Sequence, residues 1–556
     1  MRHRRWIPRL FLSLRLFLPG LFALSALLLF LKGISTPPSH DDGLCYRIPR
    51  AMSWIMDHHW HWLSATDRRL DILGTVSEWL SVPILMIFKT DRLVFLPNWI
   101  SHLFLPGLIF SVWRSLGVSQ KIAWLAMWLL PTGFCFALQA VNTSNDSLAA
   151  FFVMAAFFYA LKKGAPKPWS DFALSILCMS LATGVKLNQI PFVLPWVVAM
   201  GAGWKTMFSR PGPVAAVLSW GALISFLPTA LINWSHGRGW TGLSFDVLPP
   251  PGVNYVCTTY RILADNLMPP VVAFTPWGKP FLLGIQHSLL GGLLNQYYHE
   301  AKPVFYVQLA IQQVGIGFIV SVLLVLMILA TRGRRVSLKI DAVNAHSLRR
   351  SLIFLGLCVA FLHYLFFVNS DQPARLICTF YLLLTPVFFS GRVLRRWVPW
   401  RGCKLFAGMG MLAGLYLALF LAENPPFCLL HVLNERQQVE DRLKTEVNGI
   451  LSGNEKTIGI IRDWNQREAW LWQPYGSRRV VEFPDRPDLV QIDRLGIRHL
   501  IISKKALDID NLTIESWLAG QPWILDAYVQ PEPNTHGWYP VNNNWYVVER
   551  KPGPEK

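Results

Sequence analysis

The stretch SLRLFLPGLFALSALLLFLK, residues 13–32, is long and apolar enough to cross a membrane as a helix, which takes about 20 residues. A basic segment precedes it and no clear small-residue cleavage site follows it, so we interpret it as an uncleaved first span. Ten further apolar runs of spanning length follow: 93–113, 121–140, 147–163, 171–187, 190–204, 213–234, 304–331, 351–368, 376–391 and 404–421. The sequence therefore predicts an α-helical polytopic membrane protein with about eleven transmembrane helices.

The composition of the 556 residues agrees with this class, because 53% are hydrophobic and only 15% are charged. The net charge of +19 would suggest a nucleic-acid partner for a soluble protein. Here the Lys and Arg residues lie mostly in short connections between apolar runs, which is the positive-inside pattern. We therefore expect membrane lipids, and no nucleic acid, as partners. No Cys and His spacing suited to a structural zinc site is present in the sequence.

The charge pattern also predicts the orientation of the chain. A cytoplasmic N-terminus places every strongly basic connector inside. The same threading places five segments outside: the loop 33–92, the turn 141–146, the loop 235–303, the turn 369–375 and everything after about residue 423. If the apolar stretch 70–89 crossed the membrane, every later connector would lie on the opposite side, and the basic connectors would be outside. We expect it, and the amphipathic stretch 48–63, to lie on the outer face.

The composition changes near the C-terminus. Short β-branched runs separated by polar, Pro-containing stretches are typical of strands: KTIGIIRDW, SRRVVEF, IRHLIIS and NNNWYVVERK. We predict two domains, a membrane domain over 1–422 and a small extracytoplasmic α/β domain over 423–556. The second domain contains no phosphate loop or catalytic triad, so we expect it to cover or extend a site on the membrane domain.

Ionisable residues gather on the predicted outer face, where Asp41 and Asp42, Asp146, Lys186 and Arg375 all fall. Carboxylates beside fixed cations suit a reaction in which a hydroxyl loses a proton while a phosphate leaves. Each residue also has a structural interpretation: a solvated loop for Asp42, a helix N-cap for Asp146, snorkelling for Lys186 and interfacial anchoring for Arg375. The sequence pattern alone leaves both interpretations open.

The order of these features resembles the GT-C class of integral-membrane glycosyltransferases. Within it the chain is similar to glycosyltransferase family 39, which includes protein O-mannosyltransferases and the lipid A aminoarabinose transferase. A bacterial branch reads Trp-Asp-Ser, two variable residues and Tyr-His-x-Pro-Arg, and this chain reads DDGLCYRIPR at 41–50. The stretches SEWL, DRLVFLPNW and SNDSLAAFF resemble further motifs of that branch. Three positions depart from the pattern: Asp41 replaces Trp, Arg47 replaces His and Arg69 stands where Gln is usual.

The resemblance implies transfer of a sugar from a polyprenyl-phosphate donor to a hydroxyl of a lipid, glycan or protein acceptor. Asp42 falls on the catalytic aspartate, Asp146 on a second acidic position that orients acceptor or metal together with Asp41, and Arg375 and Lys186 bind the donor phosphate. Support of the outer loop is expected from Tyr46, Arg47, Arg50, Arg68, Arg69 and Glu78. No cofactor is assigned and a divalent metal is left open.

Two other classes of function remain as alternatives at this point. A multi-pass transporter or lipid flippase also places charged residues in helices, although it would place them near the middle of the bilayer. A sugar-binding protein that has lost catalysis would keep the fold without needing Asp42.

Overall fold

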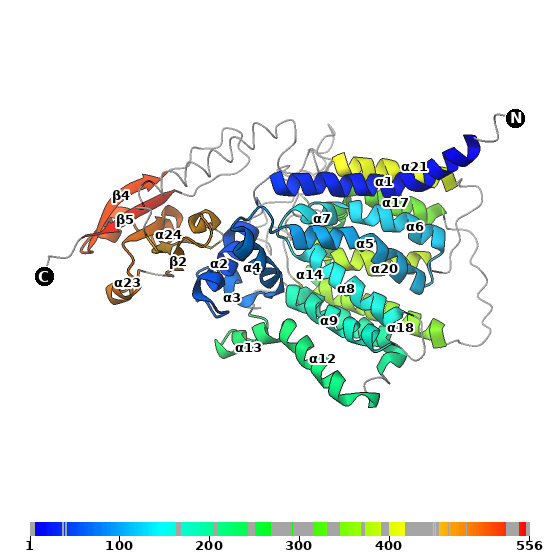
Figure 1. Ribbon diagram of the computed structural model, residues 1–556, viewed down its shortest axis with the longest axis horizontal. Helices are drawn as coiled ribbons and strands as arrows, with labels where there is room; N and C mark the ends of the chain where they lie inside the picture. Colours follow the sequence, from blue (N-terminus) through cyan, green and yellow to red (C-terminus); the bar gives the residue numbers. More distant parts are fainter. Residues whose placement is uncertain are drawn as a thin grey trace.

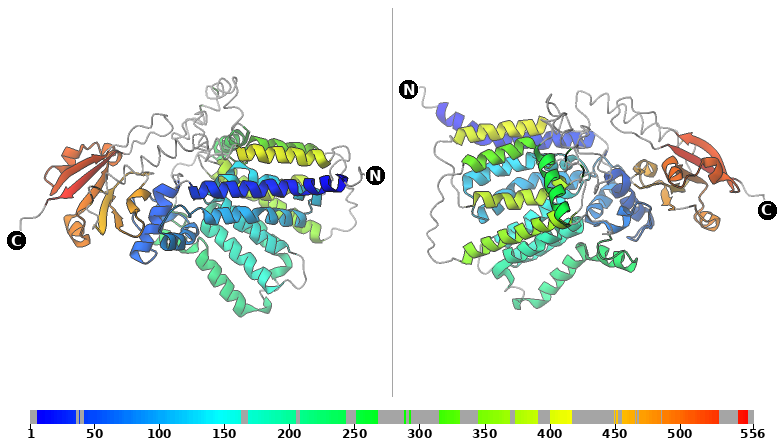
Figure 2. Two further views of the ribbon diagram at one scale, coloured as in Figure 1. Left: turned by 45° about the horizontal axis from the view of Figure 1, so that its top comes forward. Right: turned by 180° about the vertical axis from the view of Figure 1, so that it is seen from behind.

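The computed structural model describes residues 6–35, 38, 42–162, 168–204, 208–242, 251–267, 288, 292, 315–330, 345–368, 373–390, 400–416, 449, 451, 455–464, 466, 468–484, 486–529 and 544–551. A bundle of long helices forms one end of the molecule and a small β-sheet region forms the other (Figure 1). Short helices from the first hundred residues of the sequence lie between these two parts in every view (Figure 2).

The bundle is built from apolar helices that follow the sequence pattern. Its members are α1 (Trp6–Ser35), α5 (Leu96–Ser115), α6 (Gln120–Leu129), α8 (Asp146–Leu161), α9 (Trp169–Val185), α10 (Val193–Met200), α12 (Pro211–Ile224), α13 (Leu227–Ser235), α17 (Phe318–Ala330), α18 (Ala345–Phe367), α20 (Cys378–Phe389) and α21 (Trp400–Tyr416). Most of them run side by side along the long axis (Figure 1). Large side chains such as Trp113, Phe157 and Phe172 are fully buried where these helices pack together. Every predicted apolar run overlaps a helix.

Length and apolar composition qualify two of the described helices as single spans, over Leu16–Ser35 and Ser347–Phe367. Two bent pairs would raise this number to four: Gln120–Thr132 with Phe134–Val141, and Pro211–Ile224 with Leu227–Ser235. The remaining apolar helices are shorter, so the number of about eleven spans stays a prediction.

Three short helices, α2 (Ile48–Asp57), α3 (Arg69–Ile72) and α4 (Val76–Phe88), lie beyond the end of the bundle (Figure 1). Their place agrees with the prediction that 70–89 stays out of the bundle. Two expectations were wrong in detail. The helix predicted over 48–63 ends at Asp57, because His58 takes a left-handed conformation with φ 59°. The stretch 70–89 is two helices and not one, because the chain becomes extended at Leu73.

The predicted outer loop 235–303 contains an unpredicted helix, α14 (Pro251–Leu267), which packs against α18. Its buried Asn254 donates to the carbonyl of Leu365 at 3.3 Å. A polar helix face thus joins the bundle through hydrogen bonds, which hydropathy does not reveal.

The described residues of the C-terminal region form five strands: β1 (Thr457–Ile461), β2 (Arg479–Glu482), β3 (His499–Ser503), β4 (Trp523–Val529) and β5 (Trp545–Arg550). Their order in the sheet is β2-β1-β3-β5-β4, with β1 parallel to β2 and β3, and β5 antiparallel to β3 and β4. Helices α23 (Leu489–Leu495), α24 (Lys504–Ile509) and α25 (Ile514–Leu518) complete an α/β region. Four strands match the predicted runs, and β4 was not predicted.

Candidate active site

Four of the residues singled out in the sequence meet at the end of the bundle that faces the short helices. Arg375, in the short helix α19 (Pro373–Leu376), lies between two carboxylates. Its Nη2 is 3.6 Å from Asp42 Oδ2 and its Nε is 3.2 Å from Asp146 Oδ2. Lys186 Nζ contacts the other carboxylate oxygen of Asp146. The guanidinium of Arg375 therefore connects the two acidic motifs, which are more than a hundred residues apart in the sequence.

Asp146 is held by the elements that meet at the start of α8. It is the first residue of that helix, and Gln139 Nε2 donates to its Oδ2 at 3.2 Å. The neighbouring Asn145 donates to the carbonyl of Val185 at 2.7 Å, which ties this helix start to the end of α9. Lys186 follows directly, in an extended conformation with φ −156°. Asp146 is only 2% exposed, so its charge is compensated by Lys186 and Arg375 and not by water.

Asp42 is more accessible, with 18% of its side chain exposed. It precedes a π-helical turn, η2 (Gly43–Arg47), that leads into α2. Gly43 is packed so closely on Thr143 that an added Cβ would lie less than 3.0 Å from Thr143 Oγ1. The absence of a side chain at Gly43 brings the turn that carries Asp42 against the segment that leads to Asp146.

A second cation reaches Asp42 from α3. Arg69 Nη1 is 3.9 Å from Asp42 Oδ1, and its Nη2 and Nε bind Asp67 at 2.6 and 2.9 Å. Its guanidinium lies 4.6 Å from the ring centre of Tyr46 and 4.9 Å from that of Trp464. Both rings provide the negative face that a cation prefers. Burial raises the pKa of the Tyr46 phenol, which therefore stays neutral.

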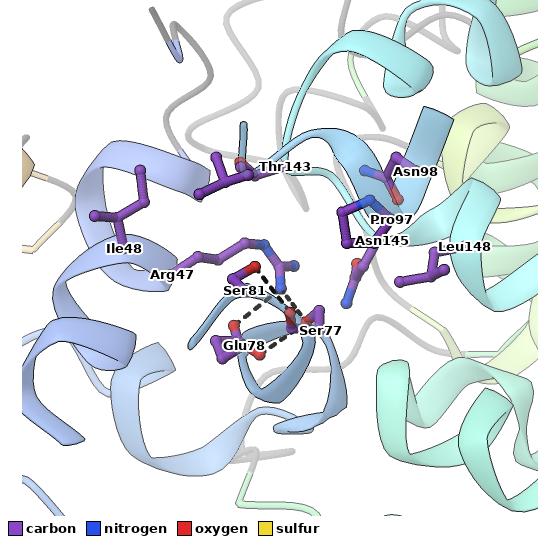
Figure 3. A pocket seen from close by; sticks show the side chains of 11 residues that line it. Arg47, Ile48, Ser77, Glu78, Ser81, Pro97, Asn98, Thr143, Asn145 and Leu148 are labelled. Carbon is purple, nitrogen blue, oxygen red and sulfur yellow. Dashed lines mark hydrogen bonds and ion pairs between the residues drawn. The ribbon is translucent and has the colours of Figure 1, made fainter. Parts of the chain in front are cut away.

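Arg47, Arg50 and Glu78, three of the other predicted support residues, form a buried polar cluster, and Figure 3 shows Arg47 with Ser77 and Glu78. Arg47 donates to Ser77 Oγ at 2.8 Å and to Glu78 Oε1 at 3.0 Å. Arg50 is fully buried, lies 3.4 Å from the same oxygen of Glu78 and donates to the carbonyls of Leu73 and Gly74. This cluster borders a pocket lined by Arg47, Ile48, Ser77, Glu78, Ser81, Val94, Pro97, Asn98, Thr143, Asn145 and Leu148.

The C-terminal region contacts the same outer segment, through residues that the sequence did not single out. Arg462 is fully buried and donates to the carbonyl of Cys45 at 3.2 Å. Its Nε is 2.8 Å from Glu468 and its Nη2 is 3.0 Å from Glu482. Glu482 in turn accepts from the backbone amide of Thr66 at 2.8 Å. Burial raises the pKa of Glu468 to about 8, against the pull of Arg462 in the opposite direction.

With this geometry in place, comparison with known proteins identifies the fold. No family model and no curated protein sequence matches the chain. The crystal structure of ArnT from Cupriavidus metallidurans bound to undecaprenyl phosphate is similar over 96% of this chain and 99% of that chain, with a TM-score of 0.51 and 12% sequence identity. The chain has the fold of ArnT. The apo structure of ArnT from the same organism, at 13% identity, covers the same shares with a TM-score of 0.42.

ArnT is a GT-C glycosyltransferase, so the fold predicted from the resemblance is confirmed. The chain shares this fold, and two of its described helices are long and apolar enough to cross a membrane. Of the predicted site residues, Asp42, Asp146, Lys186 and Arg375 lie together on this ArnT-like fold.

The remaining expectations can be placed on the same fold. Arg69 contacts Asp42 directly, and hydrogen bonds, ion pairs and a cation–π contact join Arg69 to Tyr46, Arg47, Glu78 and Arg50 in turn. Arg68 is exposed at the start of α3, and Asp41 lies outside the described residues.

Carboxylates that lie beside cations suit proton transfer next to an anionic group. The carboxylates of the candidate site are compensated by Arg375, Lys186 and Arg69 from the chain itself. We therefore assign no metal to them. Among the residues that the sequence did not single out, Arg462 and Trp464 lie directly after β1. Only the IIRDW motif, a charged and an aromatic residue after a buried strand, could have indicated them.

Proposed function

We propose that the protein is a membrane glycosyltransferase that moves a sugar from a polyprenyl-phosphate donor to an acceptor hydroxyl on the outer face of the membrane. The observation that carries this proposal is the bridge that Arg375 forms between Asp42 and Asp146. It lies in the fold of ArnT, whose crystal structure is bound to undecaprenyl phosphate. A polyprenyl phosphate is therefore the donor carrier that we propose for this chain.

Asp42 is the group that we propose as the general base. It is the more exposed carboxylate, at 18% against 2% for Asp146, so an acceptor can approach it. The acceptor oxygen attacks the anomeric carbon while its proton moves to Asp42. The bond from that carbon to the phosphate oxygen breaks, and the polyprenyl phosphate leaves with the electron pair. In-line displacement of this kind inverts the anomeric centre.

Lys186 and Arg375 are proposed to stabilise the charge that develops on the leaving phosphate. The fork of Arg375 is suited to phosphate because it can offer two N–H donors at once. Asp146 contacts both cations through its two oxygens. Its proposed role is to keep their side chains in place, since they would otherwise repel one another in a buried site.

The orientation in the membrane is part of the same proposal. We propose that the N-terminus is cytoplasmic and that α2 to α4 and the sheet region lie on the outer side. Lys89, exposed at the end of α4, is the place to test this. In a variant without native cysteines, Lys89→Cys should react with a membrane-impermeant maleimide added to whole cells. Reaction only after permeabilisation would reverse the proposed orientation.

The central test is the Asp42→Asn variant. The donor is first identified by mass spectrometry, as the lipid-linked sugar that accumulates in cells lacking the protein. The variant should bind undecaprenyl phosphate like the wild type, in native mass spectrometry, and transfer sugar at least roughly a hundredfold more slowly. Asp508→Asn, an exposed carboxylate in α24, is the matched control and should be fully active. Unchanged transfer by Asp42→Asn would remove the proposed mechanism.

A further inference from the structure

A second group of chemistry-bearing side chains lies on the C-terminal sheet. His499 in β3, Asp526 in β4 and Glu549 in β5 each offer a ligand atom, and these atoms lie within 4.8 Å of one another. None of the three belongs to the site around Asp42. They come from three strands that are neighbours in the sheet in the order β3-β5-β4. Imidazole nitrogen and carboxylate oxygen are ligands that divalent transition metals accept.

The sheet register explains why these side chains meet. His499 lies directly opposite Glu549 in the antiparallel pair of β3 and β5. The pairing of β4 with β5 shifts between Leu525 and Ala527, so Asp526 is the extra residue of a β-bulge. A bulge turns a side chain away from its regular direction. Here the redirected carboxylate reaches past β5, and Asp526 Oδ2 lies 3.7 Å from His499 Nε2.

The imidazole of His499 is held in the orientation that a metal ligand needs. Its side chain is only 4% exposed, and Nδ1 is in hydrogen-bond contact with Glu455 Oε1. A carboxylate on one ring nitrogen fixes the ring and leaves the lone pair of the other nitrogen for a metal. That other nitrogen, Nε2, is the one that faces Asp526.

The carboxylates complete an accessible set of ligands. Asp526 is 36% exposed and Glu549 is 32% exposed, so an ion can enter from solvent. Arg498 donates through Nε to Glu549 Oε1 at 2.7 Å, which fixes this carboxylate and leaves its second oxygen for another partner. Ligand atoms around a tetrahedral Zn²⁺ lie roughly 3.3 Å apart. The distance of 3.7 Å between His499 Nε2 and Asp526 Oδ2 is close to that value.

We propose that His499, Asp526 and Glu549 bind one Zn²⁺ ion, with Glu455 orienting the imidazole and water as the fourth ligand. Such an ion would connect the three strands β3, β5 and β4. Among the described strands, β4 pairs only with β5. Its binding energy would therefore stabilise the folded C-terminal region. The proposal is independent of the transferase mechanism, because it uses none of the residues assigned to sugar transfer.

The test measures zinc binding by the full-length protein in detergent, produced without a histidine tag. The chain is stripped with a chelator, and Zn²⁺ is then titrated against a fluorescent zinc indicator. One equivalent should bind at micromolar or lower free zinc and should raise the thermal unfolding temperature. His499→Ala and Asp526→Asn should abolish both effects, and Glu455→Gln should weaken binding about tenfold or more. Asp508→Asn, in the same region, should bind zinc like the wild type.

Asp526→Asn is the decisive variant, because an exposed carboxylate can be changed without removing a buried ring. Equal zinc binding by Asp526→Asn and the wild type would overturn the proposal, even if His499→Ala fails to fold. Absence of binding by the wild-type chain at micromolar zinc would overturn it as well. In that case His499 serves only as an ion-pair partner of Glu455 and Asp526.

Discussion

Gly43→Ala tests whether the close approach of the turn carrying Asp42 to the segment before Asp146 is needed for activity. An added Cβ would come closer than 3.0 Å to Thr143 Oγ1, whereas ordinary contact begins at 3.4 Å. The two segments must therefore separate. Since Asp42 is the residue before Gly43 in the chain, the separation moves it away from Arg375, whose Nη2 is now 3.6 Å from its Oδ2.

The size of the effect follows from this geometry. Restoring normal contact takes a displacement of between about 0.5 and 1 Å, and a catalytic group misplaced by about 1 Å can cost roughly a hundredfold in rate. Overpacking of this kind also costs about 1 to 3 kcal/mol of stability. We expect Gly43→Ala to transfer sugar roughly ten- to a hundredfold more slowly, and to unfold at a lower temperature than the wild type.

A rescue experiment separates this explanation from general damage. Among the described residues, Thr143 Oγ1 has no hydrogen-bond partner, so Thr143→Ala alone should be nearly neutral. The double variant removes the clashing oxygen and leaves the Cβ of residue 143 at 3.5 Å, which is ordinary contact. The double variant should therefore recover most of the activity that Gly43→Ala loses, measured as donor turnover in proteoliposomes. If the double variant is as slow as Gly43→Ala, the reasoning about this contact is refuted.

Three further predictions concern cations and acids around the site. Arg375→Lys replaces the planar guanidinium by a single ammonium group that cannot contact both Asp42 and Asp146. Donor turnover should therefore fall about ten- to a hundredfold, with little change in unfolding temperature. Trp464→Ala removes a cation–π contact of about 0.5 to 1 kcal/mol from Arg69, so turnover should fall about two- to fivefold. Glu468 has a folded-state pKa raised to about 8, so its stabilising contribution is present below the unfolded pKa and is lost as pH rises through about 8. Glu468→Gln should therefore lower the dependence of the unfolding temperature on pH between the ordinary value of 4.5 and about 8, measured by calorimetry.

The helical part of the fold could be predicted because apolar length is a strong signal. Each predicted run overlaps a helix. The positive-inside pattern and the acidic residues Asp71 and Glu78 led us to predict that the stretch 70–89 does not span the membrane. The break inside this stretch could not be predicted, since it depends on tertiary contacts. Gly74 is packed so tightly on the backbone of Gly184 that an added Cβ would clash with it. That contact joins α4 to the end of α9, just before Lys186.

Part of the candidate site could also be predicted from the sequence, but for a different reason. Asp42, Asp146, Lys186 and Arg375 could be found because a motif resemblance or a charge in an apolar run marks each of them in the sequence. The contacts among these four residues could not be predicted, because Arg375 contacts both acidic motifs only in the folded chain. No such motif or isolated charge singles out Trp464 and Arg462 in the sequence. They belong to a region that packs on η2 and α3 through contacts between residues far apart in the sequence.

The departure at Arg69 gains a physical meaning from these long-range contacts. An arginine in place of glutamine adds a charge 3.9 Å from Asp42, which by itself would alter the electrostatics of the proposed base. Asp67 binds the same guanidinium in a bidentate manner, so the added charge is largely compensated. What the substitution adds is a flat cation held between Tyr46 and Trp464. Since Trp464 belongs to the C-terminal region, this cation connects that region to Asp42. The C-terminal region therefore borders the candidate site, in part through Arg69, one of the three positions where the chain departs from the pattern that it resembles.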